Sequence, residues 1–315
     1  MRAVILDAKT LGEDICLTPI SAVTELISYP VTAPEEIPAR ISDAEIVIVN
    51  KIRLNESNLP YAPKLRLICV AATGFDNIDT EYCRRHNIAV CNVVGYSTHS
   101  VAQLSVSLVL SLMMHLPAFT DYVRSGSYTE SGVANRLYPA FHELYGKTWG
   151  IVGAGNIGGQ VARIADAFGC RVLVCRRQKD PVYATVDIDT LCREADIITL
   201  HTPLNEGTRH LISADRIASM KDSVILVNTA RGAVTDEQAV ADAVSCGKIG
   251  GLGCDVYSAE PLDKAHPFYA LRNHPNVSLT PHMAWGAVEA RQRCIEEIGE
   301  NILSFVRGEK RSRVV

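Results

Sequence analysis

The chain of 315 residues is long for a single hydrophobic core, so we expect two domains. Its 47% of hydrophobic and 21% of charged residues are usual for a globular enzyme, and its net charge of −4 argues against a nucleic-acid-binding protein, which usually carries a basic face. Ten cysteines are scattered singly and without zinc spacing, which argues against a disulfide framework and a metal site and favours reduced thiols.

The N-terminus and the most apolar stretch indicate neither export nor membrane insertion. The first residues, "MRAVILDAKT", enter a strand at once and lack the shape of a signal peptide. The apolar stretch over 101–116 is too short to span a bilayer and contains glutamine and serine, so we expect a buried helix there. We therefore expect a cytoplasmic protein without a membrane partner.

Strands and helices are predicted to alternate through the first hundred residues. Short apolar, β-branched runs are separated by polar segments that are compatible with helices. Apolar runs of this length with helical segments between them predict a parallel sheet that is covered on both faces. The runs cover 2–7, 44–50, 65–72 and 88–93.

A second alternating series is a complete doubly wound unit in its own right. A long helix near 99–124 separates it from the first series and could serve as a hinge, and the irregular stretch 124–146 is interpreted as an extended arm. An amphipathic helix over 287–308 follows the last strand, and it could cap its own domain or return to the first one. The strands of this series are expected at 147–155, 170–175, 196–201, 223–230, 250–257 and 276–282.

A glycine-rich turn links the first strand of this second series to the next helix. Gly153, Gly155 and Gly158 are in G-x-G-x-x-G register after an apolar strand and before an amphipathic helix, a context that predicts a dinucleotide site. Gly153 permits the tight turn, Gly155 leaves room for a pyrophosphate, and Gly158 lets the helix pack on the strand. The helix N-terminus, with Asn156 and Ile157, would face the phosphates. The alternative is a turn that is rich in glycine for steric reasons only.

The next strand, "RVLVC", should be followed by an acid if the ligand is NAD, because a carboxylate there accepts hydrogen bonds from the ribose 2′-hydroxyl. Arg176 and then Arg177 stand at this place instead. A guanidinium pairs with a 2′-phosphate, which a carboxylate would repel, so the sequence favours NADP(H). The alternative is that Arg176 stacks on the adenine or faces water.

Three chemically active side chains follow later strands of the same series. Arg231 comes after "LVNTA", Glu260 after "CDVYSA" and His282 after "LTP". Ligands of open α/β sheets bind outside the carboxyl ends of the strands, where an arginine suits a carboxylate and a histidine can exchange a proton. Taken singly, these residues could cap a helix, lie on the surface or fill the core, but their joint placement favours an active site.

Several motifs together resemble those of the D-isomer-specific 2-hydroxyacid dehydrogenases. The motifs are "GIVGAGNIG", "HTPLNEGTRHLI", "LVNTARGAVTDEQAVADAV", "GLGCDVYSAEPL" and "LTPHMAW", in the order and spacing of that family. The resemblance implies two Rossmann-like doubly wound α/β domains with a deep interdomain cleft, in which the C-terminal helix returns to the first domain. It places a substrate-binding domain at 1–98 plus 287–315 and a dinucleotide-binding domain at 99–286.

The resemblance also implies roles for single residues. Arg231 would bind the substrate carboxylate, His282 would donate the proton, and Glu260 would orient His282. Asp255 would contact the nicotinamide carboxamide. The resemblance implies that three more residues line the cofactor, namely Thr202, Pro203 and Thr229.

The N-terminal half is most similar to the glycerate dehydrogenase (hydroxypyruvate reductase) branch of this family. In that branch the segments matching "NK" and "ATGFDNID" border the substrate, so we expect main-chain amides around Thr73, Gly74 and Phe75 to hold its carboxylate. Lys51 would contact the far hydroxyl, or else be a solvated loop lysine. Arg176 departs from the branch, whose members often carry a small polar residue or an acid there, so the coenzyme does not carry over from the resemblance.

The expected reaction is the reversible reduction of a small 2-keto acid to the (R)-2-hydroxy acid with NAD(P)H, hydroxypyruvate and glyoxylate being favoured. Two alternatives stay open. One is a protein similar to the NAD(H)-sensing corepressors, in which the fold serves mainly to bind partners, although the chain lacks long flanks and a basic patch. The other is a reductase for a bulkier keto acid. The arm and the apolar helix resemble the dimer contacts of the family, so we expect a homodimer.

Overall fold

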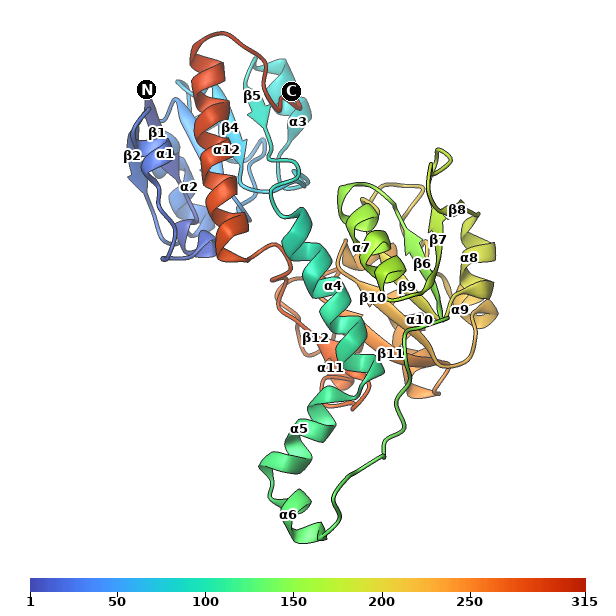
Figure 1. Ribbon diagram of the computed structural model, residues 1–315. Coiled ribbons are helices and arrows are strands. Elements are labelled where there is room, and N and C mark those ends of the chain that lie inside the picture. Colours follow the sequence, from blue (N-terminus) through green and yellow to red (C-terminus); the bar gives the residue numbers. More distant parts are fainter. The chain divides into compact units, whose positions relative to one another are not determined.

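The computed structural model describes residues 1–315, and the chain divides into two compact units. Unit 1 comprises Met1–Ser97 and Trp285–Val315, and unit 2 comprises Thr98–Ala284. Each unit is an α/β structure built on its own parallel sheet, which confirms the predicted fold class (Figure 1).

Unit 1 contains a five-stranded sheet in the order β2-β1-β3-β4-β5, all parallel. Reversal of the strand order beside β1 makes it a doubly wound sheet. Its strands are β1 (Arg2–Ile5), β2 (Glu25–Ser28), β3 (Ile46–Val49), β4 (Leu67–Val70) and β5 (Ala89–Cys91). Its helices are η1 (Ala8–Leu11), α1 (Thr18–Ser21), η2 (Pro34–Glu36), α2 (Ile37–Ile41), η3 (Leu59–Tyr61), α3 (Thr80–Arg85) and α12 (Val288–Val306).

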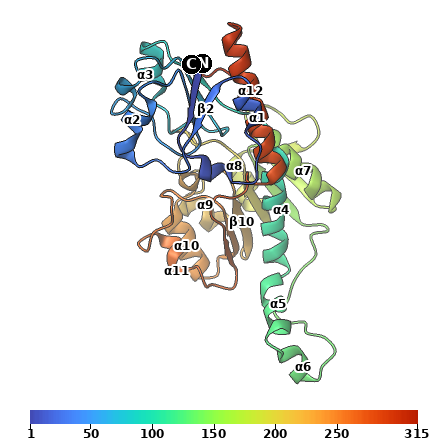
Figure 2. The ribbon, with the colours of Figure 1, turned by 90° about the vertical axis from the view of Figure 1, so that its left-hand side faces the viewer.

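Alternate residues of the strands in unit 1 enter two separate cores. The residues Ile5, Ile48 and Cys69 face one core together with Ile295 and Ile298 of α12, so the C-terminal helix packs on the first sheet. The intervening strand residues face the other core, which α2 and α3 cover. Figures 1 and 2 show α12 lying along this sheet. The last helix therefore returns to the first unit and does not cap the second one.

The last residues of the chain lie along β5, at the edge of the sheet of unit 1. Val314 N donates to Val90 O at 2.9 Å, and Asn92 N donates to Ser312 O at 3.2 Å. Val314 and Val315 also pack against the core that lies under α2 and α3. The C-terminus thereby satisfies main-chain groups of the edge strand.

Unit 2 contains a seven-stranded parallel sheet in the order β12-β11-β10-β9-β6-β7-β8. The strand order reverses between β6 and β9, which is the place where doubly wound sheets bind ligands. Its strands are β6 (Thr148–Val152), β7 (Arg171–Cys175), β8 (Ala184–Thr185), β9 (Ile197–Leu200), β10 (Val224–Asn228), β11 (Ile249–Cys254) and β12 (Val277–Leu279). Its helices are α4 (Thr98–Met113), α5 (Leu116–Arg124), α6 (Ser127–Ser131), α7 (Asn156–Ala167), α8 (Ile188–Glu194), α9 (Ala214–Ser219), η4 (Gly232–Val234), α10 (Glu237–Ser245) and α11 (Pro267–Ala270).

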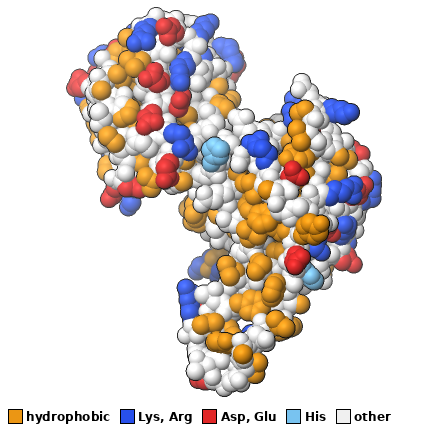
Figure 3. Space-filling view, in the orientation of Figure 1, with side chains coloured by type: hydrophobic (Ala, Val, Ile, Leu, Met, Phe, Trp, Pro, Cys, Tyr) orange, Lys and Arg blue, Asp and Glu red, His pale blue; other side chains and the backbone are white.

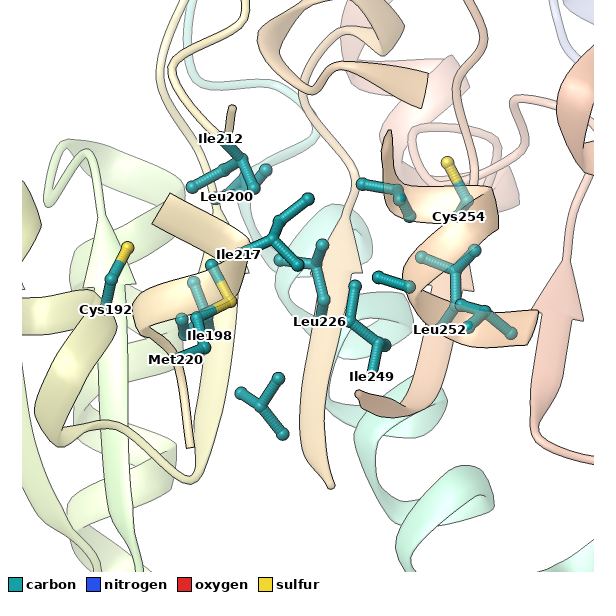
Figure 4. Close-up of a cluster of buried hydrophobic side chains, with 14 of the residues drawn as sticks. Cys192, Ile198, Leu200, Ile212, Ile217, Met220, Leu226, Ile249, Leu252 and Cys254 are labelled. Atoms are coloured by element: carbon teal, nitrogen blue, oxygen red, sulfur yellow. The ribbon is translucent and has the colours of Figure 1, made fainter. Parts of the chain in front are cut away.

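Aliphatic and sulfur-containing side chains fill the core on the β9–β11 side of this sheet. Ile198, Leu226 and Leu252, from three neighbouring strands, share this cluster with Ile217 of α9 and with Met220, the residue after α9 (Figure 4). All five are at most 4% exposed. A core packed this closely is rigid, and it fixes the carboxyl ends of β9, β10 and β11 relative to one another.

The helix predicted over 99–124 is not continuous, so that prediction is wrong in its length. His115 adopts a left-handed conformation with φ of +47°, and α4 and α5 are bent by 65° at this break. Pro117 in the first turn of α5 has no N–H for a helix that would continue from α4. No single helix has both the length and the apolar character to cross a membrane, although α4 and α5 taken together satisfy those two criteria.

Helix α4 lies in the core of unit 2, as predicted for its apolar stretch. Val106, Val109 and Leu112 are buried in the cluster that also contains Trp149. The arm (124–146) follows α5 and contains the short helix α6. It extends away from the sheet of unit 2 and then returns to β6 (Figure 1).

Candidate active site

The glycine turn after β6 has the geometry of a dinucleotide-binding turn. Gly153 has φ of +90°, and a Cβ there would lie 2.8 Å from Thr202 N and from the carbonyl carbon of His201. A Cβ on Gly158 would lie 2.2 Å from Gly153 O, so α7 packs closely on the turn. These contacts exclude any larger side chain at both positions.

The middle glycine of the turn differs from its neighbours. A Cβ on Gly155 would meet no atom within 4 Å. Gly155 is also the N-cap of α7, and no side chain caps the helix, whose first turn contains Asn156 and Ile157. Open space in front of an uncapped helix N-terminus suits a pyrophosphate, which accepts hydrogen bonds from main-chain amides. The residues of this turn therefore fit a dinucleotide cofactor.

Arg176 follows β7 directly, beside the glycine turn. Gly153 N donates to Cys175 O at 2.9 Å, which places the end of β7 against the turn. Arg176 donates to Asp180 Oδ2 at 2.9 Å, whereas Arg177 is exposed. Main-chain amides of Tyr183 and Val182, together with Arg176, hold the pKa of Asp180 below its ordinary value. Asp180 is thus ionised. Its pairing with Arg176 was not predicted from the sequence.

Three further residues predicted to line the cofactor lie at the same edge of the sheet. Thr202 and Pro203 follow β9, and Pro203 O accepts a hydrogen bond from the hydroxyl of Thr208 at 2.7 Å. Thr229 follows β10, and its hydroxyl lies 2.8 Å from that of Ser105 on α4. Their contacts with a cofactor remain a prediction.

Arg231 occupies a tight turn after β10 that Asn228 organises. Asn228 Oδ1 accepts from Ala230 N at 3.0 Å, and Asn228 Nδ2 donates to Arg231 O at 2.9 Å. Asn228 is only 1% exposed, so these two hydrogen bonds hold the turn from the buried side. The next residue is Gly232, where a Cβ would lie 2.2 Å from the carbonyl carbon of Tyr257. The Arg231 turn is therefore packed against the loop that carries Glu260.

Glu260 and His282 are hydrogen-bonded to each other. His282 Nδ1 lies 2.7 Å from one carboxylate oxygen of Glu260 and 2.9 Å from the other. Glu260 Oε1 also accepts the main-chain amide of Tyr257 at 3.1 Å. The carboxylate therefore fixes the orientation of the imidazole ring and is itself held by its own loop.

The loop that carries His282 is held by the carboxylate of Asp255. Asp255 is fully buried and accepts from the hydroxyl of Thr280 at 2.6 Å and from the amides of Met283 and Ala284 at 2.9 and 2.8 Å. His282 has φ of +53°, a left-handed conformation that is unfavourable for a residue with a side chain. The hydrogen bonds to Asp255 hold the main chain on both sides of this strained residue. The contact of Asp255 with a nicotinamide stays a prediction.

Arg231, Glu260 and His282 share one edge of the sheet in unit 2. They follow β10, β11 and β12, which are parallel and adjacent. The carboxyl ends of adjacent parallel strands meet at one edge, so a cation and a carboxylate-oriented imidazole are gathered there. This arrangement can bind an anion and transfer a proton.

The predicted substrate residues of unit 1 lie in two loops at the carboxyl ends of β3 and β4. The hydroxyl of Thr73 donates to Val93 O at 2.9 Å, and Asn92 Nδ2 donates to Thr73 O at 2.7 Å, so the segment through Gly74 and Phe75 is anchored at its start. Phe75 packs partly into the core under α2 and α3. Their main-chain contacts with a substrate remain a prediction.

Sequence reasoning missed the residue that holds the Lys51 loop. The carboxylate of Asp7, which is 4% exposed, accepts the amides of Lys51 at 2.7 Å, of Asn50 at 3.0 Å and of Ile52 at 3.1 Å. From the other side, Asn77 Nδ2 donates to Ile52 O at 2.8 Å. An acid at the carboxyl end of a buried strand, the last residue of "RAVILD", is the signal that could have pointed to this role.

Comparison with known proteins identifies a family over most of the chain. Residues 106–284 match the family model described as D-isomer specific 2-hydroxyacid dehydrogenase, NAD binding domain. The chain is 34% identical over 314 residues to a glycerate dehydrogenase from Methylorubrum extorquens, with 99% of this chain and 98% of that protein covered.

Solved structures of similar proteins cover the whole chain as well. D-Lactate dehydrogenase from Aquifex aeolicus, complexed with NAD and lactic acid, matches with a TM-score of 0.86 and 30% identity over 98% of this chain and 96% of that one. An acyclic imino acid reductase in complex with NADPH and D-Arg matches with a TM-score of 0.88 and 27% identity over 100% of both chains. With a matching family model and a full-length relative of this identity, the chain belongs to the D-isomer-specific 2-hydroxyacid dehydrogenase family.

Proposed function

We propose that this protein reduces a small 2-keto acid to the (R)-2-hydroxy acid, reversibly, with hydroxypyruvate as the favoured substrate and glyoxylate as the next. The observation that carries the proposal is the hydrogen bond between His282 and Glu260 at the sheet edge that also presents Arg231. The similarity to a glycerate dehydrogenase over nearly the full length supports hydroxypyruvate, because glycerate is its reduction product.

The side chains divide the chemistry among them. Arg231 pairs with the substrate carboxylate, since a guanidinium offers two parallel donors and stays charged. Because Nδ1 of His282 bonds to Glu260, the proton for the keto oxygen comes from Nε2. Glu260 stabilises the imidazolium before that transfer. A nicotinamide cofactor held by the Gly153–Gly158 turn would supply the hydride.

We infer that the protein prefers NADP(H). Support comes from the absence of an acid directly after β7 and from the presence of Arg176 and Arg177 there. Asp180 competes for Arg176, and a bound 2′-phosphate would have to share or replace that ion pair. The relatives do not decide the matter, because solved structures of similar proteins are complexed with NAD in one case and NADPH in another.

We also propose that unit 2 binds the dinucleotide, that unit 1 contributes substrate contacts, and that two copies of the chain assemble through the arm. Hydrophobic side chains gather over the arm (Figure 3), and Leu137, Tyr138 and Tyr145 are each more than 70% exposed. An exposed apolar patch of this kind is typical of an interface. Sedimentation equilibrium should give twice the chain mass, and Tyr138→Glu should shift it toward the monomer.

The ten unpaired cysteines support a reducing compartment such as the cytoplasm.

Steady-state kinetics tests the proposed reaction. Absorbance at 340 nm is followed with NADH and with NADPH on hydroxypyruvate, glyoxylate, pyruvate and a bulkier 2-keto acid. We expect turnover on hydroxypyruvate with the highest kcat/KM. If no keto acid of the panel is reduced with either cofactor, the proposed function is wrong and a partner-binding role becomes the better explanation.

A further inference from the structure

A buried carboxylate outside the proposed active site lies directly beneath the loops that carry it. Glu237 is the first residue of α10, and its side chain is 9% exposed. Oε1 accepts the amide of Ser258 at 2.9 Å, and Oε2 accepts both the hydroxyl of Ser258 and His266 Nε2, the latter at 3.0 Å. A carboxylate that is buried in this way requires such partners, because an unpaired charge in the interior is costly.

The histidine in this cluster has a fixed tautomer. His266 Nδ1 accepts the amide of Phe268 at 3.2 Å and caps α11, so the ring proton is on Nε2 and is donated to Glu237. The side chain of His266 is 4% exposed, and its ring packs edge-on against Tyr257 at 5.7 Å between centroids. His266 thus ties α11 and the segment after Glu260 to the carboxylate of Glu237.

The same carboxylate lies beside the turn that presents Arg231. A Cβ on Gly232 would lie 2.7 Å from Glu237 Oε1 and 2.3 Å from Ser258 N. Glycine is therefore required next to Arg231 because the Glu237–Ser258 hydrogen bond passes directly in front of it. The turn of Arg231 and the loop of Glu260 therefore both contact the hydrogen bond between Glu237 and Ser258.

Two contacts connect this cluster to the proton-transferring pair. Tyr257, the neighbour of Ser258, donates its amide to Glu260 Oε1 at 3.1 Å. The hydroxyl of Tyr257 donates to Thr280 O at 2.9 Å, two residues before His282. Burial raises the pKa of Tyr257 well above its ordinary value, so the phenol keeps its proton and this hydrogen bond. Residues 257–258 are therefore bonded both to Glu260 and to the segment just before His282, which Asp255 also holds.

We propose that Glu237, together with His266, is a positioning residue that sets the place of Glu260 and thereby the orientation of the His282 ring. The proposal rests on the proposed function, since it assigns His282 as the proton donor. In Glu237→Gln one of the two oxygens becomes an NH2 group, which donates hydrogen bonds and accepts none. The side chain can then no longer accept at both positions that serve Ser258 and His266, so the 257–260 loop loses part of its anchor.

A double-mutant cycle distinguishes positioning through Glu260 from a general structural role. Glu237→Gln should lower kcat by about tenfold to a hundredfold, the effect typical of groups that orient a functional side chain, while the Kd of NADPH from fluorescence titration changes by less than about twofold. In a Glu260→Gln background the same substitution should lower kcat by less than about threefold, because the step through Glu260 is already lost. An equal reduction in both backgrounds would overturn the proposal.

Matched variants guard against misfolding of Glu237→Gln. His266→Asn keeps a side-chain oxygen to cap α11 but cannot reach Glu237, so it should lower kcat with little change in Tm. Ser258→Ala removes only the hydroxyl and should have a smaller effect in the same direction. Asp242→Asn, on the exposed face of α10, is the control and should leave kcat unchanged. If neither His266→Asn nor Ser258→Ala changes kcat, the proposal is wrong.

A crystal structure of Glu237→Gln gives a readout that does not depend on turnover. We expect the 257–260 loop to be displaced and the distance from His282 Nδ1 to the nearer oxygen of Glu260 to exceed 3.5 Å. An unchanged hydrogen bond would contradict the proposal even if kcat falls. These outcomes can be distinguished from failure of the proposed function, because in that case the wild-type protein itself would reduce no keto acid.

Discussion

Arg176 donates to the carboxylate of Asp180 at 2.9 Å, so the guanidinium proposed to read the 2′-phosphate already has an anionic partner in the protein. Asp180 in turn accepts the amides of Val182 and Tyr183 at 3.0 Å and thereby shapes the turn after β7. Under the proposed preference for NADP(H), the 2′-phosphate and the carboxylate of Asp180 would compete for this one arginine.

Substitution of either partner should change the preference for NADPH over NADH in opposite directions. Arg176→Ser should lower the ratio of kcat/KM for NADPH to that for NADH by about tenfold or more, the value of a charge-assisted hydrogen bond. Asp180→Asn keeps an acceptor for the main-chain amides but removes the charge, so it should raise that ratio a few-fold. Initial rates at a fixed keto acid concentration measure both, with Arg177→Ser as the comparison. If Arg176→Ser leaves the NADPH/NADH ratio unchanged, Arg176 does not bind the 2′-phosphate and is an ordinary surface residue.

Loss of His282 or Arg231 should remove turnover but not cofactor binding. His282→Asn removes the proposed proton donor, and we expect kcat to fall by about 10² to 10⁴, the contribution typical of general acid catalysis. Arg231→Met should raise KM for the keto acid and also lower kcat. Fluorescence titration with NADPH should give Kd values near that of the wild type. Near-normal kcat/KM in either variant would show that these side chains do not have the proposed roles.

Asp7→Asn should act on the substrate rather than on the chemical step. The three amides of Asn50, Lys51 and Ile52 converge on Asp7, and an amide side chain can accept at only one of its two ends. The NH2 group of the asparagine would face at least one of these amide donors, so the Lys51 loop would be held less firmly. We expect KM for hydroxypyruvate to rise about tenfold, with a smaller change in kcat. Asp43→Asn, which removes a surface pair with Lys64, should leave KM unchanged. An unaltered KM in folded Asp7→Asn would argue against a substrate contact of Lys51.

His201 should make the protein sensitive to acid. Burial lowers the pKa of His201 to about 3, and neither ring nitrogen has a hydrogen-bond partner. Between pH 6.5 and about 3 the unfolded chain binds a proton that the folded chain does not, so stability falls with decreasing pH by up to about 1.4 kcal/mol per unit. His201→Leu removes this contribution. Urea unfolding at pH 7.5 and pH 5 should show a smaller loss of stability for the variant, and an equal loss would contradict the assignment.

Strands and the glycine turn were predictable because their signals are local. The apolar runs "VILVN" and "RVLVC" form β10 and β7. The glycines of 153–158 form the expected turn before α7. β2 and β8 were missed, since the edge strand β2 is half-exposed and β8 has two residues, so neither has a continuous apolar run. The break at His115 depends on a single left-handed residue within an otherwise helical pattern.

The candidate site was predictable only in part, because hydrogen-bond partners distant in sequence leave no local pattern. Glu260 and His282 could be paired since each follows a strand of the same sheet. Asp7 meets Lys51 across 44 positions, and Glu237 meets His266 across 29, so both contacts exist only once the sheets have formed. Asp180 lies only four residues from Arg176, yet its ion pair requires the turn geometry after β7.

The hydrogen bonds of Val314 and Ser312 to β5 also block the addition of a strand from another molecule at this edge. An edge strand with unpaired main-chain groups is a template on which another molecule can add a strand. Residues 311–315 occupy that edge, with Val314 and Val315 covering apolar surface as well. A chain cut after Lys310 would retain every proposed catalytic group, yet it would expose β5 to strand pairing between molecules and should aggregate on concentration.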